Sequence, residues 1–277
     1  MLFTRAYGSR FSTRSRVWGI VKLPRLRNAR LERRLILASC AAAAAAVPVA
    51  VIGYAASHGW RPLRNLDGGV AEGLHSWAVS QPGAVGFLEG VSSVLSPWTL
   101  RGAALVVVTA LFVRGQRRLA AWVGTTVVAG SVLGFSLKLI VARARPSLPD
   151  PVSSAIGSSF PSGHALNSFV ILGVFVLLAI PQVPRAWHPV VWVAAGSTIA
   201  LVGFARVSLG VHYVSDVVAG WLIGAGLIAG TVIAFDTWQR PERRAAAEIL
   251  GEGVDPEASR AAAGQPNRQN AADPEVA

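Results

Sequence analysis

Charged residues are scarce in this chain. Asp, Glu, Lys and Arg make up 14% of its 277 residues, whereas a soluble domain carries about 25%. The scarcity is uneven, because six windows contain none of these residues: 35–57, 102–113, 119–137, 165–184, 186–205 and 217–235. Several of them reach the length of about 20 residues that crosses a bilayer's hydrocarbon core. A soluble globular protein is thereby excluded, and the sequence predicts an integral membrane protein.

Cysteine is almost absent as well. Cys40 is the one cysteine, which excludes an intramolecular disulfide framework and a cysteine-cluster metal site. The net charge of +12 would suit nucleic acid, but ten of the Lys and Arg residues and a single Glu lie in residues 1–34, directly before the first apolar run. Such a cluster is typical of a cytoplasmic end beside anionic lipid. We therefore expect membrane lipids, and no nucleic acid, as partners.

The apolar runs predict an all-α fold, a polytopic membrane protein with six transmembrane helices. We expect the helices at 35–57, 98–113, 119–140, 163–181, 189–207 and 213–235. They form a domain at 35–236, preceded by a basic arm at 1–34 and followed by a polar tail at 237–277 with one short helix near 241–250. In the connection 58–97, one helical face carries Leu66, Val70, Leu74 and Trp77, which predicts a helix along the membrane surface.

The basic residues of the loops predict the orientation. Those between the second and third spans and between the fourth and fifth fall on the side of the N-terminal arm: Arg114, Arg117, Arg118 and Arg185. Six spans return both termini to that side, which the positive-inside rule assigns to the cytoplasm. We expect a multi-pass plasma membrane protein with both termini cytoplasmic and with loops 58–97 and 141–162 outside.

Ionisable side chains at membrane depth are costly and usually functional. Under the predicted topology, the outer ends of the helices carry three polar segments: Lys138 and Arg145; Ser162, Gly163 and His164; and Arg206, His212 and Asp216. We expect these segments to meet in one layer of the membrane. Their shared position on the outer side predicts an extracytoplasmic site.

The residue types in these segments suit phosphoryl transfer. His212 and Asp216 are four residues apart on one helical face, so the carboxylate can orient the imidazole and leave its other nitrogen free to attack. Ser162 suits a helix N-cap, and the N-terminus of a helix binds anions. Gly163 lets an anion approach the backbone closely. His164 lies at this anion site, where a leaving group needs a proton.

Three cations complete this arrangement. Lys138, Arg145 and Arg206 supply positive charge, and a guanidinium group matches phosphate oxygens in a two-pronged contact. The combination of nucleophile, acid, orienting carboxylate and anion cradle predicts a phosphoryl-transfer site with no metal and no cofactor.

The sequence resembles type 2 phosphatidic acid phosphatases, membrane lipid phosphatases related to bacterial acid phosphatases and vanadium haloperoxidases. The resemblance covers roughly residues 58–236 and rests on three signatures: Lys138-x6-Arg145-Pro146, Pro161-Ser162-Gly163-His164 and Arg206-x5-His212-x3-Asp216. It implies a helical core like that of the acid phosphatases and haloperoxidases. It also implies a metal-independent phosphatase.

The resemblance also implies a role for each residue. The substrate phosphate would be bound by Lys138, Arg145, Ser162, Gly163 and Arg206. His212 would attack phosphorus to form a phosphohistidine, oriented by Asp216, while His164 would protonate the leaving alcohol and then activate water. Ala205 is a departure, because many members have Ser there, so we expect weaker support of the phosphate at that point.

Three functions are compatible with this pattern. The first is a lipid phosphatase acting on a phosphomonoester or pyrophosphate, such as phosphatidic acid, phosphatidylglycerol phosphate or a polyprenyl pyrophosphate. The second is a lipid phosphotransferase that uses the same site. The third is a transporter or scaffold that binds an anionic lipid without reaction. The pairing of His164 with His212 favours an enzyme, since binding alone needs no nucleophile and acid.

The remaining ionisable residues of the outer loops receive simpler interpretations. We expect Arg143 to be a wet loop residue rather than a headgroup contact, and Asp67, Glu72 and Glu89 to be solvated. His58, His75 and His188 are interpreted as loop or interface residues, because no partner lies at a useful spacing.

Overall fold

The computed structural model describes residues 29–153 and 156–252, with side chains at 36–37, 39–153 and 156–235. The described part of the chain is helical and contains no strand. The helices are α1 (Ala29–Ser57), α2 (Arg61–Ser80), α3 (Ala84–Val94), α4 (Pro97–Val113), α5 (Arg117–Val141), α6 (Gly163–Ala179), α7 (His188–Ser208) and α8 (Val214–Glu252), with 3-10 turns η1 (Ile180–Gln182) and η2 (Arg185–Trp187) before α7.

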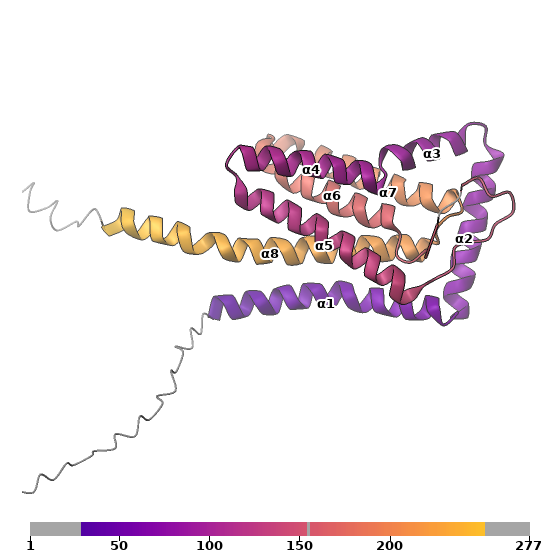
Figure 1. Ribbon diagram of the computed structural model, residues 1–277, viewed down its shortest axis with the longest axis horizontal. Helices are drawn as coiled ribbons and strands as arrows, with labels where there is room; N and C mark the ends of the chain where they lie inside the picture. The colour runs from indigo at the N-terminus through magenta and orange to yellow at the C-terminus, as the bar shows by residue number, and fades with distance from the viewer. Residues whose placement is uncertain (1–28, 154–155, 253–277) are drawn as a thin grey trace, which may run out of the picture.

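Six helical segments are long and apolar enough to cross a membrane within the described residues. They are Ser39–Ser57, Ala84–Val113, Arg117–Val141, Gly163–Gln182, Arg185–Ser208 and Val214–Phe235. The second joins α3 to α4. Figure 1 shows α1, α4, α5, α6, α7 and α8 running along one another as a bundle. The predicted all-α fold with six spans is confirmed.

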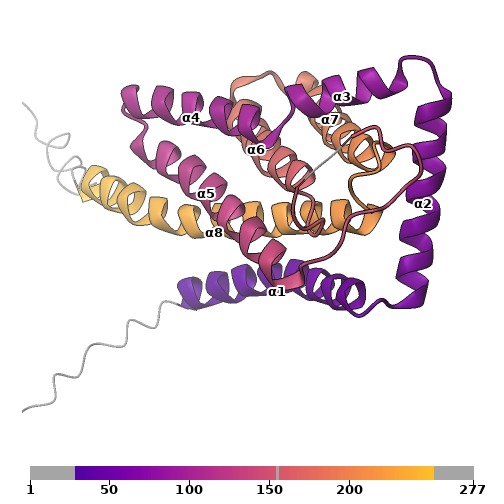
Figure 2. The ribbon, with the colours of Figure 1, turned by 45° about the vertical axis from the view of Figure 1, so that its right-hand side comes forward.

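The helix expected in the connection 58–97 is α2, which runs across one end of the bundle in Figures 1 and 2. Its buried residues are Asp67, Ala71, His75 and Ala78. In the predicted apolar face, Leu66 and Trp77 remain 57% and 45% exposed. The inward face of α2 is thus offset from the apolar one, and it buries two ionisable residues.

Both described ends of the chain lie at the other end of the bundle in Figure 1, because an even number of spans returns the chain to its starting side. Residues 1–28 of the expected basic arm and 253–277 of the expected tail lie outside the described residues. Helix α1 begins at Ala29 and α8 continues to Glu252, so the short helix expected near 241–250 is part of α8.

The start of α6 is held against α8 by close packing at Gly220. A Cβ atom added to Gly220 would lie 3.0 Å from the Ser162 carbonyl oxygen and 3.0 Å from the Leu166 backbone nitrogen. Phe160, just before α6, is fully buried in a cluster with Leu166 and Ile223. The turn that leads into α6 is therefore fixed on both sides.

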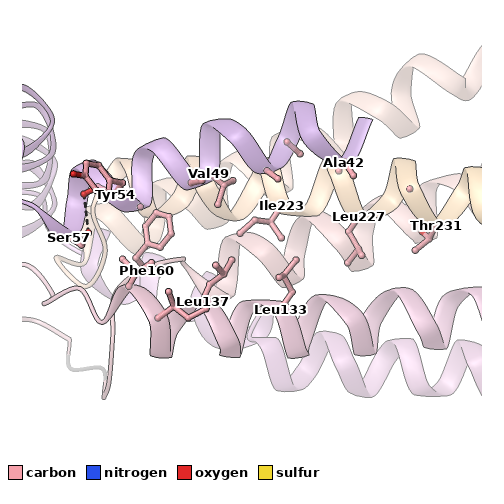
Figure 3. Close-up of a pocket in the computed structure, with 18 residues that line it drawn as sticks. Ala42, Val49, Tyr54, Ser57, Leu133, Leu137, Phe160, Ile223, Leu227 and Thr231 are labelled. Carbon is pink, nitrogen blue, oxygen red and sulfur yellow. Dashed lines mark hydrogen bonds between the residues drawn. The ribbon is translucent and has the colours of Figure 1, made fainter. Parts of the chain in front are cut away.

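An apolar groove of about 730 Å³ runs between α1, α5 and α8. Figure 3 shows Val49, Leu133 and Ile223 facing it from these three helices, with Phe160 near one end. Val141, three residues after Lys138, also lines it. The groove thus reaches the end of the bundle where α6 and α8 begin.

Candidate active site

The three polar segments of the sequence come together where α5 and α7 end and α6 and α8 begin. His164, the second residue of α6, lies within electrostatic range of His212, Arg206 and Arg145. Lys138, in the last turn of α5, also lies within electrostatic range of Arg145 and Arg206. The structure therefore gathers the two histidines and three cations of the predicted site at one end of the bundle.

Ser162 joins the start of α6 to α8. Its side-chain oxygen caps α6 by accepting from the Ala165 N–H at 3.4 Å, and its own N–H donates to the Asp216 carbonyl oxygen at 3.0 Å. At Gly163, an added Cβ would meet no atom within 4 Å. The N-terminus of α6, with its free N–H groups and positive dipole end, is therefore open at the position predicted to bind an anion.

His212 and Asp216 face one another beneath this helix start. The His212 Nδ1 lies 3.5 Å from the Asp216 Oδ2, and the two side chains are 3% and 0% exposed. That separation is at the outer limit of a hydrogen bond, and Nδ1 makes no formed hydrogen bond within the described residues. The two groups therefore face each other without a formed hydrogen bond. In substrate-free enzymes, hydrogen bonds between catalytic groups are often this long and shorten when substrate binds.

The surroundings of His212 keep its imidazole neutral. Burial lowers the pKa of His212 to about 4, since it outweighs the attraction of Asp216, and Arg145 and Arg206 lower it further. With Nδ1 facing the carboxylate and Nε2 3.3 Å from the Arg145 Nη1, these contacts favour a proton on Nδ1. Nε2 then carries the unprotonated lone pair that a nucleophile requires at neutral pH, and this lone pair accepts from the Arg145 Nη1.

Arg145 and Lys138 both hold the loop before α6. The Arg145 Nε donates to the Gly157 carbonyl oxygen at 3.0 Å, and its Nη1 donates to the Val211 carbonyl oxygen at 2.7 Å. The Lys138 Nζ donates to the Ser158 carbonyl oxygen at 2.7 Å. Two of the three predicted cations are thus fixed by backbone carbonyls around the site.

Arg206 is the third cation and is 7% exposed. Its Nε has no hydrogen-bond partner among the described residues. A buried, unpaired donor on a charged group is costly, so such a group calls for an explanation. An anion bound beside Arg145 and the two histidines would supply the missing acceptor.

The expectation that Arg143 is a solvent-exposed loop residue is wrong. Its side chain is 9% exposed and forms ion pairs of 2.7 Å with both Asp216 and Asp67. The expectation that Asp67 is solvated is also wrong, because its side chain is 1% exposed. Sequence reasoning missed this pair because Asp67 lies 76 residues before Arg143. The available signal was a second arginine inside the first signature.

His75 was also misjudged as a loop or interface residue. It is 5% exposed, with Nδ1 3.1 Å from the Ser208 carbonyl oxygen and Nε2 3.0 Å from the Pro149 carbonyl oxygen. These contacts tie α2 to the end of α7 and to the loop before α6. His75 therefore stabilises the position of backbone segments that lead into the site.

Within the described residues, no group of three or more His, Cys, Asp or Glu side chains is placed to hold a metal ion.

Comparison with known proteins gives consistent matches. Residues 119–240 match the model of the PAP2 superfamily. Phosphatidylglycerophosphatase B of Bacillus subtilis is 36% identical over 95 residues, which are 34% of this chain and 46% of that protein. Undecaprenyl-diphosphatase of Sulfolobus acidocaldarius is 37% identical over 100 residues, 34% of this chain and 44% of that protein. The chain thus spans about half the length of these curated relatives.

A solved structure shares the fold. The crystal structure of a transmembrane PAP2 type phosphatidylglycerolphosphate phosphatase from Bacillus subtilis superposes with a TM-score of 0.62 at 21% identity. The match covers 72% of this chain and 97% of that one. The likeness extends over most of the helical bundle and supports the fold.

Proposed function

Because residues 119–240 match the model of the PAP2 superfamily, we propose that this protein is a membrane lipid phosphatase. It hydrolyses a phosphomonoester or pyrophosphate of a lipid through a phosphohistidine at His212. One observation carries the proposal. A buried, neutral His212 presents its Nε2 beside Arg145 and beside Arg206, whose buried Nε has no partner among the described residues. The two curated relatives are named as phosphatases of lipids, which supports the same class of reaction.

The substrate phosphate binds between the start of α6 and the cations. Backbone N–H groups at Gly163 and the positive end of the α6 dipole meet the phosphate oxygens, and Arg206 supplies its unpartnered Nε. Arg145 and Lys138 add charge from the α5 side. Donors fixed before the reaction stabilise the negative charge on the phosphoryl oxygens in the transition state, at little cost in reorganisation.

The reaction proceeds in two displacements. The lone pair of the His212 Nε2 attacks phosphorus, a P–N bond forms, and the bond from phosphorus to the leaving oxygen breaks. His164, in its imidazolium form, donates a proton to that oxygen and becomes neutral. Water then attacks phosphorus and gives a proton to His164, and the P–N bond breaks. Inorganic phosphate leaves, and both histidines return to their starting states.

His164 suits the acid role through its position. It stands at the N-terminal turn of α6, close to the backbone of Ser92 in α3. The in-line displacement of this proposal needs His212 and His164 on opposite sides of the phosphorus atom.

The groove between α1, α5 and α8 supports a lipid substrate. It is apolar, lies among candidate membrane spans and ends at Phe160, one residue before the Pro161-Ser162 turn. In this proposal the hydrocarbon chain of the substrate lies in the groove while its headgroup reaches the cations. Because the chain comes from the bilayer and not from water, van der Waals packing rather than the hydrophobic effect favours its place in the groove.

The site faces the extracytoplasmic side in this proposal. The bundle end opposite the site carries the basic residues of the short loops, Arg114, Arg117, Arg118 and Arg185. Basic loops favour the cytoplasmic side. Both termini then lie in the cytoplasm, and substrate reaches the site from the outer leaflet.

The experiment is phosphate release by the purified protein in detergent from a panel of phosphatidic acid, phosphatidylglycerol phosphate and a polyprenyl pyrophosphate, with a chelator present. We expect turnover of at least one lipid, and loss of that turnover in His212→Ala. His188→Ala is the matched control, because His188 lies at the far end of the bundle and should keep wild-type rates. Turnover retained by His212→Ala, or turnover that depends on an added divalent ion, would overturn the scheme. Release of less phosphate than the lipid consumed would identify a phosphotransferase instead.

A further inference from the structure

We propose that Arg143 is a positioning residue for Asp216, and that Asp67 on α2 holds Arg143 in place. The inference rests on the proposed function and extends it, because it adds two residues that the three signatures do not assign. Its basis is a buried chain of contacts that runs from α2 through Arg143 and Asp216 to His212.

Arg143 bridges two buried carboxylates. Its Nη1 donates to the Asp216 Oδ1 at 2.7 Å, and its Nη2 donates to the Asp67 Oδ2 at 2.7 Å. The two carboxylate side chains are 0% and 1% exposed. Short contacts between ionised groups are the strong members of the hydrogen-bond class. The guanidinium is therefore held at both ends.

Ser215 closes the arrangement into a ring. Its N–H donates to the Asp67 Oδ1 at 3.0 Å, its hydroxyl donates to the Asp67 Oδ2, and the same hydroxyl accepts from the Arg143 Nη1 at 2.8 Å. Asp67 thus places a carboxylate at the first turn of α8, where the helix dipole favours negative charge. Helix α2 is tied to the helix that carries Asp216.

The face of the guanidinium is also fixed. It lies over the Tyr213 ring, with its central carbon 4.0 Å from the ring centroid. Burial alone would lower the pKa of Arg143, but Asp216 and Asp67 raise it above its ordinary value. Arg143 therefore stays charged and keeps one orientation. A lysine has no planar fork to make these contacts together.

These contacts determine what Asp216 offers to His212. Because Oδ1 is taken by Arg143, only Oδ2 faces the His212 Nδ1, and the same Oδ2 accepts from the Tyr213 N–H at 3.0 Å. Rotation of the carboxylate is thereby blocked. Without Arg143, the two buried carboxylates would lose their shared cation, and the Asp216 Oδ1 would lose the contact that fixes its orientation.

The test is a set of steady-state measurements on variants of the full-length protein, in detergent, with the lipid phosphate that the wild type hydrolyses fastest. For Arg143→Gln we expect kcat to fall by about 10- to 100-fold, the range typical for removal of a group that orients a functional histidine or carboxylate, with KM little changed. Asp67→Asn should lower kcat less. Arg143→Lys should restore only part of the loss. Arg64→Gln is the matched control, because Arg64 is an exposed arginine on the same α2 helix.

The double variant Arg143→Gln with Asp67→Asn separates positioning from folding. Removing one partner of a buried ion pair is strongly destabilising, whereas removing both is much less so. Asp216 still lacks its cation in the double variant, so we expect the unfolding temperature to recover only part of the loss seen in Arg143→Gln, while kcat stays low. Full recovery of kcat would overturn the proposal, because the role of Arg143 would then be structural. A raised KM with unchanged kcat would also overturn it, since Arg143 would then bind the substrate phosphate itself.

A second readout keeps this proposal independent of turnover. The ¹⁵N NMR shifts of the His212 ring, assigned by comparison with His212→Ala, report which nitrogen carries the proton. We expect a proton on Nδ1 in the wild type and a mixture of tautomers in the double variant. Identical tautomers in both would refute the positioning role even if no substrate were turned over. A wild type that hydrolyses no lipid phosphate would refute only the proposed function.

Discussion

At the scale of single residues, the chemistry depends on His212 remaining neutral inside a cluster of cations. Desolvation of the imidazolium outweighs the attraction of Asp216, and Arg145 and Arg206 act in the same direction as desolvation. In the proposed mechanism, the arginines that bind the phosphate therefore also keep the His212 Nε2 free of a proton. A phosphate placed among them reverses this effect, since its negative charge stabilises the imidazolium.

The first prediction concerns the titration of His212. Its pKa is lowered from 6.5 to about 4 in the free protein, so the reactive neutral form persists as the pH falls and is lost only near pH 4. We expect ¹³C NMR of the ring in the substrate-free protein to show no protonation between pH 8 and pH 5. Added inorganic phosphate should raise the pKa. A midpoint at or above 6.5 in the free protein would contradict this account of the site.

Some of these residue roles could be read from the sequence and some could not. The pairing of His212 with Asp216 is local, because residues four apart share a helical face. The N-cap at Ser162 is local as well, because it joins residues three apart. The bond from Asp67 to Arg143 joins residues 76 apart, so only the packing of α2 across the bundle reveals it.

At the scale of helices, the site depends on how closely α8 approaches the start of α6. Gly220 permits this approach, and the backbone bond from Ser162 to Asp216 crosses the same contact. The order of the helices was predictable from their apolar runs. The contact itself was not, because a glycine in an apolar helix is compatible with many packing partners.

The second prediction is that Gly220→Ala lowers both stability and activity. The added Cβ would press on the Ser162 carbonyl oxygen and the Leu166 nitrogen, so the two helices must separate. Overpacking of this kind costs about 1–3 kcal/mol. Thermal unfolding in detergent and phosphate release measure the two effects.

Gly196→Ala in α7 is the control, because an added Cβ there meets no atom within 4 Å and Gly196 does not line the groove. It should leave activity unchanged and cost no stability, since Ala favours a helix more than Gly does. Equal losses of stability and activity in both variants would show that the close contact at Gly220 does not cause them.

The third prediction tests the groove. Ala46 lines it and Ala44 does not, although both are exposed on α1. Ala46→Phe should fill the groove and raise KM for a long-chain lipid phosphate. Ala44→Phe should not. Both variants should hydrolyse a phosphate ester without a hydrocarbon chain at the same rate. Equal KM values for the lipid in the two variants would show that the groove does not bind the hydrocarbon chain.

At the scale of the whole molecule, the basic residues of the short loops support the proposed orientation. The sequence predicted the number of spans from hydropathy alone, and the structure has that number among the described residues. Hydropathy did not distinguish groove-lining residues from lipid-facing ones. In a membrane protein, both surfaces are made of the same apolar side chains, so only their arrangement separates them.

The fourth prediction is that the end of α2 lies outside the cell and the turn between α4 and α5 lies inside. In a Cys40→Ala background, Gln81→Cys and Gln116→Cys place single thiols at these two exposed positions. A membrane-impermeant maleimide applied to intact cells should label the first variant only. Labelling of the second variant alone would place the site at the cytoplasmic face.

The measurement that tests the central claim most directly is capture of the covalent intermediate. Wild-type protein is mixed with its lipid phosphate, quenched in alkali and digested, and the peptides are examined by mass spectrometry. The account predicts a phosphoryl group on the nitrogen of His212 in the wild type. It predicts none at that peptide in His212→Ala. A phosphoryl group found on His164 instead, or turnover by His212→Ala at the wild-type rate, would contradict the account.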